Sequence, residues 1–588
     1  MGYLPTDPAN FASEAIDGFA AAYPRHVRRI DGGVMRLAPI PSGQVGVVVG
    51  GGSGHYPAFA GLVGRGLAAG AVCGNIFASP SAGQVVRVGS AVERGAGLLL
   101  TFGNYAGDVL HFTLGAERLR RQGIDVRIVT VTDDIASAPI DQQELRRGIA
   151  GGLAVYKVAG AAAEAGLPLD EVERLARKAN GRTRSLGVAF SGCTLPGADQ
   201  PLFEVPSGRM AIGMGLHGEP GLSEGPLTEA GPLAALLVER LLAERPADVP
   251  EDQQRLVVLL NGLGCFKYEE LFVLFGAVNR ELQGRGVVMA DCECGELVTS
   301  LDMAGVSLSF FWLDGELEGF WNAAADSAAY RRGQLAAESD GPQPLATQRP
   351  EPELPSGPPT QTAAPLTPVQ QALLARFKAV EEELQERVEE LGGLDAVAGD
   401  GDHGLGMLRG IRGARESAIG ACGRGCGPGE VLMEAGEAWS DHGGGTSGAL
   451  WGGALLAAGQ SLAQATEIGP NDVAAAFGAA LQAVIDLGQA APGDKTMLDA
   501  LQPFCLRLRA DLDAGLDLAQ ALQNAANTSL AAATATADLL PQRGRARPHG
   551  QRSLGHPDPG AMSMAYCLLA ASAGYVGLHG VADPAQAS

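Results

Sequence analysis

The chain has 588 residues, which is too many for a single hydrophobic core, so the sequence predicts two or three domains. Apolar residues make up 46% of it, enough to bury a core in each domain. Lys and Arg number 43 against 66 Asp and Glu, giving a net charge of −23. Because such an acidic surface is repelled by phosphate backbones and anionic lipids, we expect neither nucleic acid nor a membrane as a partner.

The N-terminal segment and the cysteines indicate a cellular compartment. Residues 1–20 lack the basic flank and apolar core of a signal peptide, and no run of about 18 apolar residues occurs. Nine cysteines, an odd number spread thinly, are typical of reduced thiols. The pairs Cys292/Cys294 and Cys422/Cys426 lack the spacing of a zinc site. We therefore expect a cytoplasmic protein without disulfides or zinc.

Short apolar runs alternate with helix-compatible segments before residue 335. Three runs, each ending in glycine or acid, occupy 45–50, 97–102 and 125–134, and a second set occupies 185–190, 255–264 and 306–313. This alternation predicts strands of an α/β domain with its chemistry on the loops that follow them. We expect residues 1–335 to form two α/β subdomains, about 1–184 and 185–335.

The amino-acid composition changes at residues 336–366, which are rich in Pro, Thr, Ser and Gln and poor in large apolar residues. Such a stretch buries too little surface to order itself and is expected to be a flexible linker. Beyond it, residues 367–588 are rich in alanine, with apolar residues recurring every three or four positions. They predict an all-α domain with helices in 369–397, 474–489, 518–540 and 562–577.

The first strand runs into the loop GGGSGH, residues 50–55. The loop lacks the G-x-G-x-x-G spacing of a dinucleotide site, and no acidic residue ends the next strand in the expected place. It remains either a tight turn with a surface histidine or a turn that presents a catalytic His55.

Two further loops carry candidate acid–base groups. Asp108 lies in GNYAGDVLHF, where a strand ends and a helix begins, and is either a helix N-cap, which the sequence alone favours, or a catalytic carboxylate. His217 lies between glycines in GMGLHGEPG, residues 213–221. These side chains form an acid–base set if the fold brings them together.

Three carboxylates, Asp395, Asp400 and Asp402, crowd the segment LDAVAGDGDHGLGM of the helical domain. Their mutual repulsion favours a Mg²⁺ site over a solvated acidic turn. Two more glycine loops, residues 441–453 and 556–563, offer hydroxyls and backbone N–H groups to phosphates. The stretch GQAAPGDKT is not a Walker loop, because Asp494 precedes Lys495 and no strand is predicted before it.

Taken together and in this order, the motifs resemble those of the dihydroxyacetone kinase family in its ATP-dependent form with two fused domains. GGGSGH, GNYAGD, TDD, GLHGEPG, NGLG and TSLDMAG are similar to its substrate-binding part, and GDGDHG, GGTSGA, GDKTMLDAL and GHPDPGA to its nucleotide part. The resemblance covers nearly the whole chain.

The resemblance implies a ketose held covalently on His217 as a hemiaminal. It implies that His55 and Asp108 relay the proton of the terminal hydroxyl that attacks the γ-phosphate of ATP. The substrate pocket would be lined by Gly52, Ser53, Gly54, His55, Gly103, Asp108 and His217.

For the second domain the resemblance implies a barrel of helices and two Mg²⁺ ions held by Asp395, Asp400 and Asp402. The nucleotide would contact Asp400, Gly401, Asp402, His403, Thr446, Ser447, Gly488, Thr496, Met497, Asp558, Pro559 and Gly560. It also implies a homodimer.

Two positions depart from the family pattern. Gly103 stands where the family has a lysine, and Tyr56 stands where it has a glutamate after the histidine. Loss of the lysine removes a donor and side-chain volume, so a longer ketose would fit. We expect erythrulose to be favoured over dihydroxyacetone, and we expect Tyr56 and Gly103 together to shape the pocket for this preference. A ketose-binding regulator without turnover, a phosphoprotein donor in place of ATP and an FAD-cyclising side activity remain open.

Overall fold

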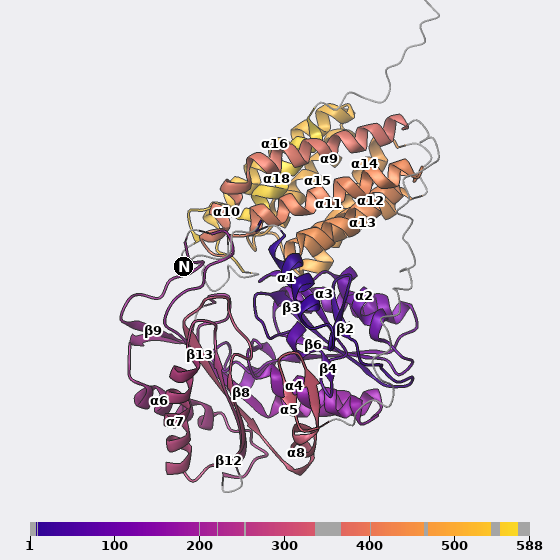
Figure 1. The fold of residues 1–588 in the computed structure, drawn as a ribbon. Coiled ribbons are helices and arrows are strands. Elements are labelled where there is room, and N and C mark those ends of the chain that lie inside the picture. The colour runs from indigo at the N-terminus through magenta and orange to yellow at the C-terminus, as the bar shows by residue number, and fades with distance from the viewer. Residues whose placement is uncertain are drawn as a thin grey trace, which may run out of the picture.

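The computed structural model describes residues 7–8, 10–198, 200–219, 221–251, 254–334, 366–399, 401–463, 468–542 and 553–573. The chain forms an α/β half, up to residue 334, and a helical half that begins after residue 366 (Figure 1). Of the predicted linker 336–366, only residue 366 lies within the described part. No helix in that part is long and apolar enough to cross a bilayer.

The first sheet has six strands in the order β1-β2-β5-β3-β6-β7. Strands β5, β3, β6 and β7 run parallel, and β1 and β2 form an antiparallel extension at one edge. Strand bounds are β1 Val27–Ile30, β2 Gly33–Arg36, β3 Gly46–Ser53, β5 Gly70–Ile76, β6 Leu98–Gly103 and β7 Val126–Val131.

Helices cover both faces of this sheet because its parallel strands are apolar on both sides. One face packs against α2 (Ala82–Val92) and α3 (Ala106–Arg121), and the other against α4 (Gly152–Glu164) and α5 (Leu169–Gly181). Helix α1 (Phe11–Ala22) lies near the antiparallel edge.

The second sheet has the order β10-β9-β8-β13-β11-β12 and is antiparallel except for the pair β11 and β12. Its bounds are β8 Thr183–Ala189, β9 Arg209–Ile212, β10 Ser223–Pro226, β11 Arg255–Gly262, β12 Val288–Gly295 and β13 Gly305–Trp312. Helices α6 (Ala230–Ala243) and α7 (Tyr268–Gly284) cover one face. On the other face, Val257, Leu259 and Phe311 join the core beneath the first sheet, so the two sheets share buried surface.

Smaller elements complete this half. A three-stranded sheet joins β4 (Gly64–Arg65) to β14 (Ala325–Ser327) and β15 (Arg331–Arg332), next to α8 (Gly315–Asn322). Two 3₁₀ helices, η1 (Ala60–Leu62) and η2 (Ile140–Leu145), lie in the connections.

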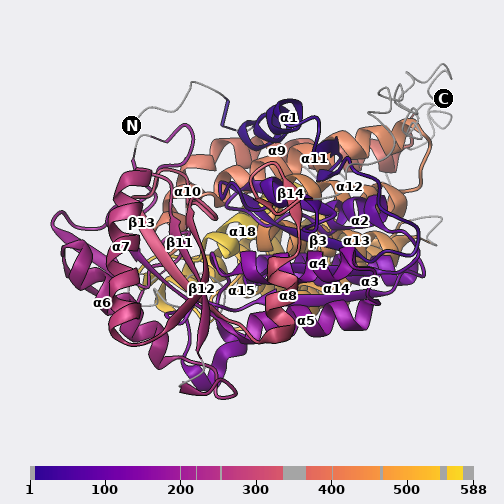
Figure 2. The same ribbon diagram turned by 60° about the horizontal axis from the view of Figure 1, so that its bottom comes forward.

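The helical half packs around one core, and its helices lie together beside the first sheet (Figures 1 and 2). Neighbours in the chain pack on one another from α11 to α16, and α18 packs against both α16 and α9. The bounds are α9 Pro368–Glu386, α10 Val388–Ala396, α11 His403–Gly423, α12 Pro428–Gly443, α13 Gly445–Leu462, α14 Pro470–Gly488, α15 Leu498–Asp513, α16 Leu518–Ala535, η4 Thr536–Asp538 and α18 Pro559–Ser572.

The six predicted strands are confirmed, as are the α/β character of the first part and the helical character of the second. One expectation is wrong: no α-helix directly follows the first predicted strand, because β3 leads through η1 and β4 into β5. The prediction also missed α11, α12 and α13, whose glycine-rich sequences weaken the helical signal, and α15, which has Pro503 inside it. Close packing explains those glycines, since a Cβ on Gly410 would lie 2.5 Å from the Trp439 indole nitrogen.

Candidate active site

A cavity of about 250 Å³ lies between the two sheets and the helical half. His55, Asp108 and His217 are among the residues that line it, and we call it the histidine pocket. His55 follows β3 of the first sheet and His217 follows β9 of the second, so the packing of the two sheets forms the site. The three predicted catalytic side chains are therefore brought together.

The two histidines contact each other directly. The Nε2 atoms of His55 and His217 are 3.0 Å apart. His55 Nδ1 lies 2.8 Å from the Thr299 carbonyl oxygen, and His217 Nδ1 lies 2.9 Å from Glu219 Oε1. Both oxygens only accept, so each Nδ1 carries a hydrogen.

The contact between the two Nε2 atoms depends on the protonation of the rings. With both Nδ1 atoms protonated, the hydrogen bond between the Nε2 atoms needs one further hydrogen. Burial, together with the neighbouring His217, lowers the pKa of His55 to about 3. The Glu219 carboxylate faces the His217 ring, where it would stabilise a proton shared by the two histidines.

Glu219 is held as a carboxylate. Burial alone would raise its pKa, but His217 and Arg147 bring the pKa well below its usual range. Arg147 Nη1 lies 3.7 Å from Glu219, and Arg147 Nη2 lies 2.8 Å from Asp134. The His217 backbone N–H also donates to Glu219 Oε2, at 3.0 Å. The His217 ring is thus fixed in orientation and tautomer by a buried, charged partner.

Aromatic rings fix the position of the histidines. The Phe77 ring stacks on His55 with centroids 4.9 Å apart and meets His217 edge-on at the same distance. Gly52 permits this approach, because a Cβ there would lie 2.9 Å from the Ala78 backbone nitrogen. The glycines of the first loop therefore serve close packing and the exposure of His55 to the pocket.

The GNYAGD loop forms another wall. Gly103, Tyr105 and Asp108 line the pocket, and Asp108 is buried in the first turn of α3. Tyr105, not Asp108, occupies the N-cap position, so the N-cap interpretation of Asp108 is wrong. Within the described residues the Tyr105 hydroxyl is buried and has no hydrogen-bond partner.

Two residues predicted in the pocket and one predicted beside it lie elsewhere. The Ser53 hydroxyl donates to the Gly74 carbonyl at 2.6 Å, and neither Ser53 nor Gly54 lines the cavity. The Tyr56 side chain is 44% exposed, packs edge-on against Phe19 and is absent from the lining. The expectation that Tyr56 shapes the substrate pocket is therefore wrong, because the chain turns outward after His55.

The helical half closes the pocket. Gly445 and Thr446, at the start of α13, are part of the lining. The next residue, Ser447, lies on the other side of the turn, with its hydroxyl 3.5 Å from His403 Nδ1. His403 Nε2 lies 2.9 Å from the Ser563 hydroxyl, at the start of α18. One helix start thus connects the histidine pocket to the predicted nucleotide residues.

The predicted metal ligands Asp395 and Asp402 lie beside His403, among the predicted nucleotide residues. The His403 backbone N–H donates to Asp395 Oδ2 at 3.3 Å, and burial and Asp395 raise the pKa of Asp402. A cation would relieve this repulsion, so the two carboxylates fit Mg²⁺. Asp400 lies outside the described residues, and among those described no group of three metal-ligating side chains occurs.

Other predicted nucleotide residues gather beside these carboxylates. Asp558 caps α18, which begins with Pro559 and Gly560, and its pKa is raised to about 7 by burial and by the charges of Asp499 and Asp395. A Cβ on Gly560 would lie 3.6 Å from the Met497 nitrogen, which places the 496–497 turn against this helix start. Gly401 has φ +74° in the turn before α11. Gly488 lies at the end of α14, against Leu450.

Sequence reasoning missed several side chains that organise the pocket. Glu219 and Tyr105 lie inside the GLHGEPG and GNYAGD motifs, so their polar side chains next to the candidate residues could have marked them. Glu219 bonds to His217, and the Tyr105 ring meets His217 edge-on. Arg147 and Phe77 carried no local signal, because they reach the histidines only through the fold. Thr299 lies in the TSLDMAG motif, but it contacts His55 through its backbone carbonyl, which a side-chain pattern does not mark.

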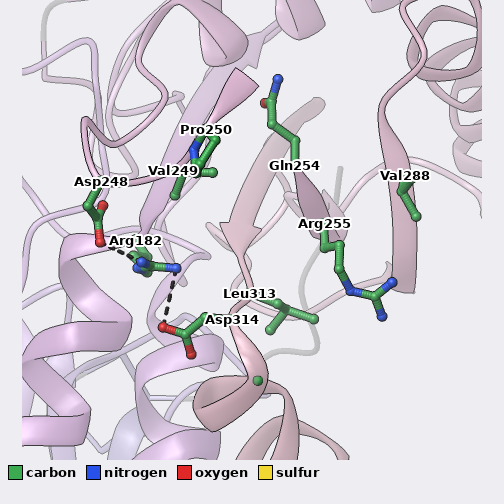
Figure 3. A pocket seen from close by; sticks show the side chains of 10 residues that line it. Arg182, Asp248, Val249, Pro250, Gln254, Arg255, Val288, Leu313 and Asp314 are labelled. Carbon is green, nitrogen blue, oxygen red and sulfur yellow. Dashed lines mark hydrogen bonds and ion pairs between the residues drawn. The ribbon is translucent and has the colours of Figure 1, made fainter. Parts of the chain in front are cut away.

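A second, larger cavity of about 740 Å³ lies where β11 and β12 begin and β13 ends (Figure 3). Arg182 crosses it between Asp248 and Asp314. Its described lining contains no histidine, cysteine, serine, threonine or lysine. Its carboxylates Asp248 and Asp314 both pair with Arg182, so the histidine pocket is the candidate active site.

The fold and the site define a two-domain protein in which a helical domain closes a histidine pocket of an α/β domain. The model of the Dak1 domain matches residues 17–329, and that of the DAK2 domain matches residues 397–573. The L-erythrulose kinase of Pectobacterium atrosepticum is 50% identical over 97% of this chain and 96% of its own length. The D-erythrulose kinase of Mycolicibacterium smegmatis is 51% identical over 96% and 97%.

Among solved structures, the dihydroxyacetone kinase from C. freundii in complex with AMP-PNP and Mg²⁺ is similar over 97% of this chain and 98% of that one. The TM-score is 0.52 and the sequence identity 31%. The chain belongs to the dihydroxyacetone kinase family.

Proposed function

We propose that the chain is an ATP-dependent kinase that phosphorylates a terminal hydroxyl of a short-chain ketose, with erythrulose favoured. The observation that carries this proposal is the pair His55 and His217 beside Asp108, in a pocket closed by Thr446 of the helical half. Two relatives named as erythrulose kinases, about half identical over nearly the whole chain, support the four-carbon substrate. Dihydroxyacetone, named for the C. freundii enzyme, is the alternative.

His217 is the residue that would hold the ketose. A proton on His217 Nε2 passes by way of His55 to the carbonyl oxygen. The freed Nε2 lone pair then bonds to the carbonyl carbon. The π electrons of the C=O bond form the new O–H bond. The alkylated ring keeps one positive charge, and Glu219 faces it. Glycerol has no carbonyl and cannot form this bond, so the chemistry itself selects ketoses.

The Tyr105 hydroxyl supports a polyhydroxylated substrate. It is buried at the pocket and lacks a hydrogen-bond partner among the described residues. Leaving such a group unsatisfied costs about 1–3 kcal/mol. A substrate hydroxyl would satisfy it, which adds to binding.

For phosphoryl transfer, Asp108 and His55 would accept the proton of the terminal hydroxyl as its oxygen attacks the γ-phosphate. Asp395, Asp400 and Asp402 would hold Mg²⁺, for which we propose two ions. Bound Mg²⁺ neutralises charge on the triphosphate. The triphosphate would lie between the starts of α11, α13 and α18, against His403, Thr446, Ser447, Thr496, Met497, Asp558, Pro559 and Gly560, with Gly401 and Gly488 near it.

Gly103 is the position that would admit the longer ketose. Its Cβ would lie 3.0 Å from the Tyr105 ring, at the cavity wall. A lysine there would fill part of the 250 Å³ pocket and add a charged donor. Tyr56, outside the lining, would not contribute.

Wild-type enzyme should show a higher kcat/KM for D- or L-erythrulose than for dihydroxyacetone in an ATP-coupled assay. Gly103→Lys should shift the ratio toward dihydroxyacetone by about tenfold, the effect of a few misfitted atoms. Tyr56→Glu is the matched control and should leave the ratio unchanged. Chelation of Mg²⁺ should stop every reaction. A wide preference of the wild type for dihydroxyacetone would exclude the tetrulose assignment, and ketose binding without turnover would favour a regulator.

Glu219→Gln should lower kcat/KM for the ketose by about 10–100-fold, because the charge on the His217 ring loses its buried counter-ion. The KM for ATP should not change, which separates this positioning role from a general loss of folding. Glu224→Gln serves as the control, since Glu224 is an exposed carboxylate on β10 paired with Arg209. Equal kinetics of both variants would contradict the role of Glu219.

Three further properties belong to this proposal. The contacts of α18 with both α16 and α9 support a barrel of helices in the second domain. Nine free cysteines support a cytoplasmic location, where thiols stay reduced. We also propose a homodimer, as the resemblance implies.

A further inference from the structure

Helices α2 and α3 of the α/β half meet the turn between α12 and α13 of the helical half. We call this contact the seam; it comprises residues 79–87 and 107–111 on one side and residues 441–446 on the other. Gly445 and Thr446 also line the histidine pocket. Whatever fixes the seam therefore fixes the helical half over the pocket.

His111 bridges the two halves from a fully buried position. Its Nδ1 accepts the Ala82 backbone N–H at 3.2 Å, and its Nε2–H donates to the Gly445 carbonyl at 2.7 Å. Burial lowers the pKa of His111 to about 4, so the ring is neutral at pH 7 and each nitrogen has a single role. The bond to Gly445 ties the first residue of α13 to the centre of α3.

Asp441 makes the second tie. Its Oδ1 accepts the Ser81 hydroxyl and its Oδ2 accepts Arg87 Nη1, at 3.0 Å. Ser81 is also the N-cap of α2, where its hydroxyl accepts the Gln84 N–H. Both oxygens of the Asp441 carboxylate therefore accept hydrogen bonds from α2 and its N-cap, one from Ser81 and one from Arg87.

Small residues let the two halves approach this closely. A Cβ on Gly83 would lie 2.7 Å from Asp441 Oδ1, and one on Gly107 would lie 3.5 Å from the Thr446 hydroxyl. Gly445 has φ +57°, a conformation that glycine adopts without strain, and its N–H donates to the Ser79 carbonyl at 3.2 Å. The turn is therefore shaped to dock rather than merely to connect two helices.

We propose that His111 and Asp441 are positioning residues for phosphoryl transfer, holding the start of α13 over the histidine pocket so that the hydroxyl bound there faces the nucleotide side. Neither residue touches substrate. The inference rests on the proposed function, because it assumes that the two sites exchange a phosphoryl group. It adds that the seam sets the geometry of transfer, while the groups proposed to hold the ketose and the nucleotide lie outside the two substituted side chains.

The test compares His111→Phe and Asp441→Ala with wild type in the full chain. Both should lower kcat for ketose phosphorylation by about tenfold or more, as loss of a buried hydrogen bond implies. The KM values for ketose and ATP should change less than about threefold, because neither substituted side chain touches the ketose or ATP. His111→Gln, which keeps an N–H donor for Gly445, should recover part of the rate. Glu434→Gln, on α12 but paired with Arg424, is the matched control and should behave as wild type.

Amide hydrogen exchange gives a readout independent of turnover. Residues 79–84 and 441–447 should exchange faster in both variants and not in Glu434→Gln. Wild-type kcat in both variants, or a lowered kcat with unchanged exchange at the seam, would overturn the proposal. If the wild type phosphorylates no ketose, the proposed function fails. The docking contact would still be established if amide exchange at the seam is slow in the wild type and faster in the two variants.

Discussion

His217→Ala is expected to lower kcat/KM for erythrulose by a factor on the order of 10³ and to abolish the preference for ketoses over glycerol. The variant loses the atom that bonds to the carbonyl carbon and the partner of His55, whose Nε2 lies 3.0 Å away. Polyols never form that bond, so their slow turnover should not fall. An ATP-coupled assay with erythrulose and glycerol measures both values.

His26→Ala is the matched control for this experiment. His26 also contacts a carboxylate, Asp326 at 3.5 Å, but it lies outside the histidine pocket. It should retain wild-type kinetics and selectivity. If His217→Ala kept the wild-type ratio of erythrulose to glycerol turnover, the covalent role of His217 would be wrong.

Asp108→Asn should lower kcat by about 10²–10⁴, the range that a positioned general base contributes. The KM for the ketose should change little, because the amide keeps the shape of the carboxylate at the pocket wall. The buried position in the first turn of α3 places Asp108 beside the reacting hydroxyl in our proposal. Steady-state kinetics with erythrulose separate kcat from KM.

Asp125→Asn provides the comparison for this variant. Asp125 is an exposed carboxylate of the same half and pairs with Arg127 at 2.8 Å. It should not affect kcat. A normal kcat for Asp108→Asn, or a change confined to KM, would show that Asp108 does not handle the proton.

The strands could be predicted because apolar runs such as 97–102 and 306–313 end at glycine or acidic residues, and both signals are local. The edge strands β1 and β10 and the neighbouring β9 were not predicted, since they are short and their stability comes from neighbouring strands. In the helical half, glycine lowers intrinsic helix propensity, and packing overrides it. Gly436 and Gly452 show this, because a Cβ on either would lie within 2.7 Å of the other's carbonyl oxygen.

The sequence alone predicted which segments would carry chemistry. His55, Asp108 and His217 each lie in a glycine-containing segment that follows a run of apolar residues, and that composition marks them. It did not decide whether Asp108 is a helix N-cap or a catalytic carboxylate, because the burial of a side chain is a property of the fold. It also favoured Tyr56 as a pocket residue, because sequence neighbours point in directions that only the backbone trace fixes.

Only the tertiary structure decided how these parts meet. The His55–His217 contact joins residues 162 positions apart, and the His111–Gly445 bond joins residues 334 positions apart. Patterns of period two and 3.6 specify which face of a strand or helix is buried, and glycine marks where the chain turns. They do not specify which buried faces pack together. The packing of two sheets and a helical domain fixed the contact between the two histidines, the Glu219 carboxylate beside His217 and the turn that closes the pocket.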